Sequence, residues 1–160
     1  MRGAKTGKYT QTKSHKDLTG KTWVTRENVF VDRIACAWLI RRFIDPTARF
    51  KFVSSKKYKP QPNELRFDMF DAEYTHDGDL CSFEVMIRRC GLDQKLFTPL
   101  AEIVHDIDLK DGKFGRPETA GIKTLFSAIV TAHPKDEERI DIGGRILDDL
   151  FEHYKQQVKA

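Results

Sequence analysis

Apolar residues recur at helical spacing along most of the chain. This spacing predicts five helices. They cover residues 33–44, 81–90 and 93–109, then a stretch that begins at Pro117 and another that begins near Asp136.

The first of these helices is apolar on nearly every side from Ile34 to Ile40. A helix without a polar face belongs in the interior, so we expect it at the centre of the domain. Asp32 is predicted to cap its start, and Pro46 to end it, because proline cannot continue a helix and restricts the residue before it.

Apolar and charged residues alternate in two short stretches, 49–54 and 64–70, which a Lys- and Pro-rich segment connects. A weaker alternation over residues 21–30 predicts a strand entering the domain. We interpret the two stretches as short antiparallel strands. The fold class predicted is therefore α+β: a mainly helical single domain of about five helices with a small antiparallel sheet.

Charge divides the chain into an arm and a domain. The net charge is +4, but residues 1–21 hold six Lys or Arg against one acid, so the remainder is close to neutral. We expect residues 1–21 to form a basic, disordered arm that could touch nucleic acid, and residues 22–157 to form one domain. A solvated tail is the alternative for the arm.

No apolar run reaches the length of a membrane span, and the first twenty residues lack the apolar centre of a secretory signal. The three cysteines, Cys36, Cys81 and Cys90, lie in apolar surroundings without a C-x-x-C pair, as expected of reduced thiols. A cytoplasmic protein that does not enter membranes is predicted.

Candidate chemistry centres on the helix over residues 93–109. At 100° per residue, Asp108 points toward the margin of the apolar face, and His105 lies one turn earlier. Glu102, Asp106 and Asp111 are expected to be ordinary surface charge.

A carboxylate at a core margin needs a cation or hydrogen-bond donors. The preceding helix and its loop offer Glu84 and His76. Two imidazoles and two carboxylates would suit Mn, Fe or Zn with positions left for water. The alternative is structural: Glu84 pairs with Arg88, Asp108 pairs with Arg89 or Arg42, and His105 is a satisfied, half-buried histidine.

Arginines offer a different chemistry, because forked donors near a helix start can hold a tetrahedral oxyanion. Arg33 and Arg42 are the candidates. The competing interpretation is that they neutralise Asp32, Asp45 or Asp108 in structural ion pairs. Neither a nucleophile elbow nor an exposed basic recognition helix is present in the sequence.

Three long strings carry a family resemblance: "TWVTRENVFVDRIACAWLIRRFIDPTARFKFV", "FDMFDAEYTHDGDLCSFEVMIRR" and "AEIVHDIDLKDGKFGRPETAGI". Over residues 23–154 the chain resembles the chromate-resistance proteins of the ChrB type. The polar and aromatic positions that fall in these strings are Asp32, Arg33, Trp38, Arg42, His76, Glu84, His105 and Asp108.

The resemblance implies a role in bacterial chromate resistance, as a regulator or an accessory detoxification factor. Our first hypothesis is a metal-binding domain with ligands His76, Glu84, His105 and Asp108, in which the ion acts as a Lewis acid, a redox centre or a sensor. The second is a non-catalytic regulator that binds chromate through Arg33 and Arg42, with the basic arm on nucleic acid. A purely structural interaction module, with or without homo-oligomerisation, is the third.

Overall fold

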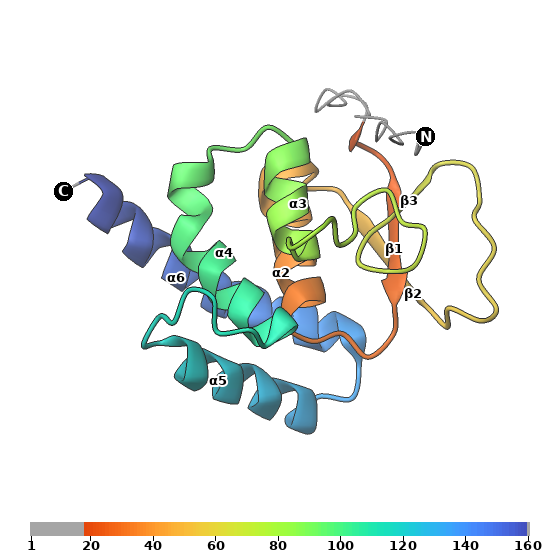
Figure 1. Cartoon of the computed structure of the whole chain (residues 1–160). Helices are drawn as coiled ribbons and strands as arrows, with labels where there is room; N and C mark the ends of the chain where they lie inside the picture. Colours follow the sequence, from red (N-terminus) through yellow and green to blue (C-terminus); the bar gives the residue numbers. More distant parts are fainter. Residues whose placement is uncertain (1–17, 160) are drawn as a thin grey trace, which may run out of the picture.

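Three strands and five α-helices make up the part of the chain that the computed structural model describes, residues 18–159 (Figure 1). Residues 1–17, most of the predicted basic arm, lie outside the described residues. In chain order the elements are β1 Thr22–Arg26, α2 Val31–Leu39, the π-helical segment η1 Ile40–Ile44, β2 Arg49–Val53, β3 Glu64–Arg66, α3 Ser82–Arg89, α4 Gln94–Leu109, α5 Thr119–Ala132 and α6 Asp136–Lys159.

The residues just before β1 already belong to the folded part. Leu18 is buried in the core, and the amide of Gly20 donates to Asp45 Oδ2 at 2.8 Å. None of the helices among residues 18–159 combines the length and the apolar character needed to cross a lipid bilayer.

The sheet is parallel, so the prediction of an antiparallel sheet was wrong. Its strand order is β2-β1-β3, and β1 runs parallel to both neighbours. Trp23 pairs with Phe50 on one side and Leu65 on the other. The two stretches predicted to be short antiparallel strands, β2 and β3, therefore do not pair with each other, because β1 lies between them.

The alternation of apolar and charged residues could not reveal this direction, since its period of two is the same in parallel and antiparallel strands. The burial of β1 does agree with a parallel sheet, because Trp23, Val24 and Thr25 are all buried. A strand covered on both faces is typical of parallel sheets, where a helix crosses between paired strands. Here α2 provides the crossing between β1 and β2.

Helix α2 lies at the centre of the domain, as predicted, with the sheet on one side and α3, α4 and α6 around it (Figure 1). Of its nine residues, Arg33 alone is not buried. Its start differs from the prediction, because the N-cap is Phe30 and Asp32 lies inside the first turn. Its end is as predicted: η1 stops at Asp45, which is extended ahead of Pro46.

The remaining helices follow the predicted order. Helix α3 ends before Gly91, whose φ of 67° is the expected left-handed conformation, and α4 is capped by Asp93. Aromatic rings fill the space between α2, η1, α4 and α6. Ring centroids lie 5.0 to 5.8 Å apart in the pairs Trp38–Phe43, Phe43–Phe97, Phe43–Phe151, Phe97–Phe151 and Trp38–Phe151.

Candidate metal centre

Four polar side chains converge where the starts of α2 and α3 meet the end of α4. We call this set, Asp32, Asp68, His76 and Asp108, the acidic pocket. The three carboxylates line a cavity of about 90 Å³ together with Arg33 and apolar residues of α2 and α4. His76 contacts these carboxylates from the loop between β3 and α3.

Asp32 is buried, and the start of α3 holds its carboxylate. Oδ1 accepts the amide of Phe83 at 2.9 Å, and Oδ2 accepts the amide of Ser82 at 3.1 Å. The first amides of a helix have no partner within the helix and carry partial positive charge. Asp32 satisfies them from another helix, which offsets part of the cost of burying its charge.

His76 links the carboxylates. Its Nε2 atom lies 2.9 Å from Asp108 Oδ2, 3.4 Å from Asp32 Oδ2 and 3.7 Å from Asp68 Oδ1. Asp32, His76 and Asp108 each offer a ligand atom within 4.8 Å of the others. This spacing allows one ion to contact all three.

Asp68 belongs to the pocket although the sequence analysis did not select it. Its backbone is left-handed, with φ at 47°. Oδ1 accepts the hydroxyl of Ser82 at 2.8 Å, and Oδ2 pairs with Arg33 Nε at 3.3 Å. The alternation had placed it in a predicted strand, residues 64–70, whereas β3 ends at Arg66 and Asp68 lies in the loop that follows. Its position between the alternating apolar residues Phe67 and Met69 was the one available signal.

The acidic pocket holds three carboxylates and a single imidazole, so its negative charge is not fully balanced. Burial raises the pKa of Asp32 to about 6, although the bond from His76 opposes the rise. Burial, with the neighbouring Asp68, also raises the pKa of Asp108. The hydrogen bond to Asp32 in turn raises the pKa of His76 to about 9. These carboxylates therefore favour an added positive charge.

The Oδ2 atom of Asp108 gives the same indication. It is buried and makes no hydrogen bond of regular geometry within residues 18–159, and its close partner there is His76 Nε2, in an ion pair at 2.9 Å. A buried carboxylate oxygen without a hydrogen bond is costly. The protonated His76 ring offsets part of that cost, and a bound metal ion would do so in its place.

The other two predicted ligands form a separate group, which we call the His105 row: Glu84, His105 and Asp111. His105 Nδ1 lies 2.5 Å from Glu84 Oε1, and Nε2 lies 2.9 Å from Asp111 Oδ2. The four predicted ligands are thus divided between two groups. His76 and Asp108 share one, and Glu84 and His105 share the other.

The charge state of the His105 row follows from its hydrogen bonds. The imidazole side chain has no exposed surface, and burial alone would lower its pKa. The bonds to Glu84 and Asp111 outweigh burial and raise the pKa of His105. The expectation that Asp111 is ordinary surface charge was wrong, because its carboxylate turns back onto this ring.

The loop between α4 and α5 supplies partners for the other acids of the segment. Glu102 pairs with Arg116 at 3.1 Å, and Asp106 accepts the amides of Phe114 and Gly115. Within residues 18–159, Glu84 bonds to His105 and to the Cys81 amide, not to Arg88. Asp108 likewise has no ion pair with Arg42 or Arg89 in that range. The alternative in which these arginines neutralise Glu84 and Asp108 is therefore not what the structure has.

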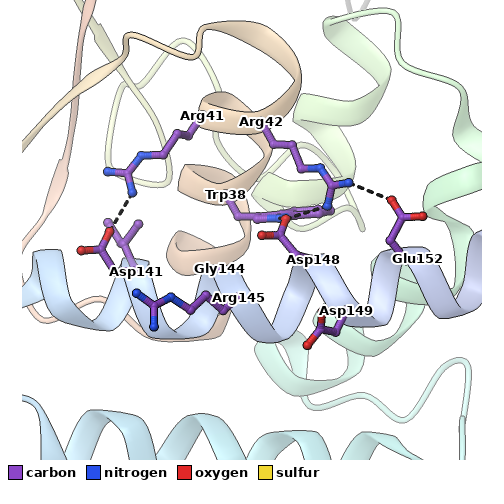
Figure 2. A pocket seen from close by; sticks show the side chains of 10 residues that line it. Trp38, Arg41, Arg42, Asp141, Gly144, Arg145, Asp148, Asp149 and Glu152 are labelled. Carbon is purple, nitrogen blue, oxygen red and sulfur yellow. Dashed lines mark hydrogen bonds and ion pairs between the residues drawn. The ribbon is translucent and has the colours of Figure 1, made fainter.

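The two arginines proposed for an oxyanion lie in different places. Arg33 lines the acidic pocket and pairs with Asp68 through Nε. Arg42 lies in a groove of about 580 Å³ between η1 and α6, where it pairs with Asp148 at 2.6 Å and Glu152 at 2.8 Å (Figure 2). The structure therefore does not bring them together around one ligand.

The cysteines are free and buried, as the sequence analysis expected. Cys36 Sγ lies 3.8 Å from Asp32 Oδ1, and Cys81 adjoins Glu84 and His105. Burial raises the pKa of both thiols, which keeps them protonated and weakly nucleophilic.

The fold and the pocket together define a small, mainly helical α+β domain with a part-buried cluster of histidine and carboxylates. The sequence comparison gives this class its family. Residues 23–154 match the model of the ChrB C-terminal domain, so the chain belongs to that family.

A curated relative supports the assignment. The chain is 38% identical over 141 residues to Protein ChrB of Cupriavidus metallidurans, an alignment that covers 88% of this chain and 43% of that protein. The chain therefore spans less than half the length of this relative. No solved structure matches the chain.

Proposed function

We propose that this chain is a metal-binding domain that serves chromate resistance. The ion is a divalent transition metal held by Asp32, His76 and Asp108, with Asp68 beside them. The observation that carries the proposal is the acidic pocket itself: three carboxylates line one cavity and share contacts with one imidazole, and one of their oxygens is buried without a hydrogen bond.

The donor set favours particular metals. One imidazole nitrogen with several carboxylate oxygens suits Mn²⁺ and Fe²⁺, and Zn²⁺ also accepts this combination. No cysteine among residues 18–159 lines the cavity, so soft thiolate ligands, which would favour copper, are not part of this donor set. The three reduced cysteines also support a cytoplasmic location.

The link to chromate rests on the family. Its physical difficulty is that a dianion is repelled by carboxylates. A bound divalent ion removes much of this repulsion, and Arg33 adds positive charge at the wall of the cavity. Binding chromate through Arg33 and Arg42 jointly, the alternative function, has no support from geometry because the two guanidinium groups lie in separate pockets.

Metal analysis of the protein purified without chelator, followed by calorimetric titration with Mn²⁺, Fe²⁺ and Zn²⁺, tests the proposal. We expect one ion per chain, and a loss of affinity of about tenfold or more in His76→Ala and Asp108→Asn. Two matched controls should bind as wild type: His133→Ala, whose imidazole pairs with Glu138, and Asp141→Asn, which pairs with Arg41 at the surface. Equal affinity in all four variants would refute the pocket as the site.

The role of the ion in receiving chromate has its own measurement. Chromate should raise the melting temperature of the metal-loaded protein and leave that of the metal-free protein unchanged, because a ligand stabilises the state that binds it. Stabilisation of the metal-free protein would instead favour the arginine-based alternative.

A further inference from the structure

In the His105 row both nitrogens of the imidazole are engaged in hydrogen bonds with carboxylates. Both ring nitrogens of His105 face a carboxylate, Glu84 at 2.5 Å and Asp111 at 2.9 Å, on opposite sides of the ring. Neutral imidazole has a single N–H, so two ionised partners require the doubly protonated ring. Each ring nitrogen of His105 is thus already engaged by a carboxylate, whereas His76 contacts its three carboxylates through Nε2.

Glu84 connects this row to the start of α3. Its Oε1 atom also accepts the amide of Cys81 at 3.1 Å. The next two amides, those of Ser82 and Phe83, donate to Asp32. Three consecutive amides at the start of α3 are therefore held by two carboxylates, one from the acidic pocket and one from the His105 row.

Helix α4 contributes to both groups from adjacent turns. His105 faces Glu84 of α3, and Asp108, one turn later, faces His76 in the acidic pocket. The contact between His105 and Glu84 thus ties α3 to α4. The placement of α3 against α4 determines how far Asp32, which the start of α3 holds, lies from Asp108.

We propose that His105 is a positioning residue for the cation. It fixes Glu84 and, through the first turn of α3, the carboxylate of Asp32. This inference rests on the proposed function, because it assigns His105 a role toward the ion held in the acidic pocket. Groups that orient metal ligands commonly change metal affinity without touching the metal.

Mn²⁺ titration of the full chain, read by calorimetry and by the electron paramagnetic resonance spectrum of the bound ion, tests the proposal. We expect His105→Gln and Asp111→Ala to lower Mn²⁺ affinity by about tenfold and to broaden the spectrum, because Asp32 is held less firmly. Asp111→Asn should restore most of the affinity, since its amide oxygen still accepts from Nε2.

The control is Tyr154→Phe, which removes a 2.7 Å hydrogen bond from the tyrosine hydroxyl to Glu118 at a distant place. It should lower the melting temperature and leave Mn²⁺ affinity and the spectrum unchanged. If Asp111→Ala behaves like this control, the row is merely structural and the inference is overturned. If His105→Gln does not fold, the comparison of Asp111→Ala with Asp111→Asn decides the outcome.

Failure of the inference differs from failure of the proposed function. The wild-type titration comes first, and absence of Mn²⁺, Fe²⁺ and Zn²⁺ binding there would refute the cation site and this inference with it. Wild-type binding combined with unchanged affinity in folded His105→Gln and Asp111→Ala would refute only the positioning role.

Discussion

The Nε2 atom of His76 lies 2.9 Å from Oδ2 of Asp108, which joins the loop ahead of α3 to the last turn of α4. The imidazole is part-exposed, and the carboxylate oxygen that it contacts is buried. In the metal-free protein the protonated ring therefore supplies the positive charge that the acidic pocket needs. A metal ion would have to replace that proton.

The first prediction concerns the stability of the metal-free protein. The pKa of His76 in the folded state, about 9, lies above its ordinary value of 6.5. Its stabilising contribution is then complete below pH 6.5 and is lost as the pH rises through 9. We expect the free energy of unfolding, measured by urea denaturation in the presence of chelator, to fall across this interval.

His76→Gln should remove part of that decline. His105, whose pKa is also raised, contributes in the same direction, so some slope should remain. Burial raises the pKa of Tyr154 to about 12, above this interval, so Tyr154→Phe is the control and should keep the full wild-type slope. An identical pH dependence in wild type and His76→Gln would show that the imidazole does not neutralise the pocket.

The second prediction concerns protons released when the ion binds. Coordination requires neutral imidazole, so below pH 9 each ion displaces about one proton from His76. Mn²⁺ affinity should rise about tenfold per pH unit between pH 6 and 9. Below pH 6 the slope should steepen, because Asp32, with a pKa of about 6, must also lose a proton.

Calorimetry in two buffers of different ionisation enthalpy counts these protons directly. The difference in apparent binding enthalpy should correspond to about one proton at pH 7.5 in the wild type. A count of zero would mean that the ion does not bind through His76.

Helical spacing was sufficient to place the residues of α4. The 100° geometry put Asp108 at the core margin and His105 one turn before it, and the structure places both side chains there. The same geometry could not join α4 to the correct partners. Glu84 and His76 were assigned to one site because they are near each other in sequence, whereas α3 carries Glu84 away from the loop that holds His76.

The features that residue spacing could not predict depend on contacts between residues far apart in the sequence. The direction of β2 and β3 is set by their pairing with β1, which alternation does not encode. Asp68 and Asp111 lie in loops whose conformation brings their carboxylates back toward Ser82 and His105. Asp32 looked like the cap of its own helix, and only the packing of α2 against α3 shows that it caps the neighbouring helix.

The third prediction tests the groove between η1 and α6 (Figure 2). Asp148 Oδ1 accepts the indole N–H of Trp38 at 2.7 Å and pairs with Arg42. Asp148→Ala leaves the N–H of a nearly buried tryptophan without this partner, which should cost about 1–3 kcal/mol in the free energy of unfolding. Asp141→Ala breaks only an exposed pair with Arg41 and should cost at most about 1 kcal/mol. Equal costs in urea denaturation would contradict the structural role of the indole bond.

The fourth prediction concerns the adjacent glycines of α6, which should respond in opposite directions to alanine. At Gly143 an added Cβ would lie 2.6 Å from Cγ2 of Ile34 and 3.1 Å from Cε1 of Phe126, and both neighbours are buried. The backbone of α6 approaches α2 so closely here that no methyl group fits. Gly143→Ala should therefore destabilise the fold by about 1–3 kcal/mol.

At Gly144 the nearest atom to an added Cβ is Cδ1 of Trp38, at 3.7 Å, an ordinary contact distance. Alanine restricts the unfolded chain and favours the helix, so Gly144→Ala should stabilise the fold by about 0.5–1 kcal/mol. The two variants differ only in the side of α6 that carries the methyl group, which makes each the control for the other. Stabilisation by both, in chemical or thermal denaturation, would mean that α6 does not lie as close to Ile34 as the structure has it.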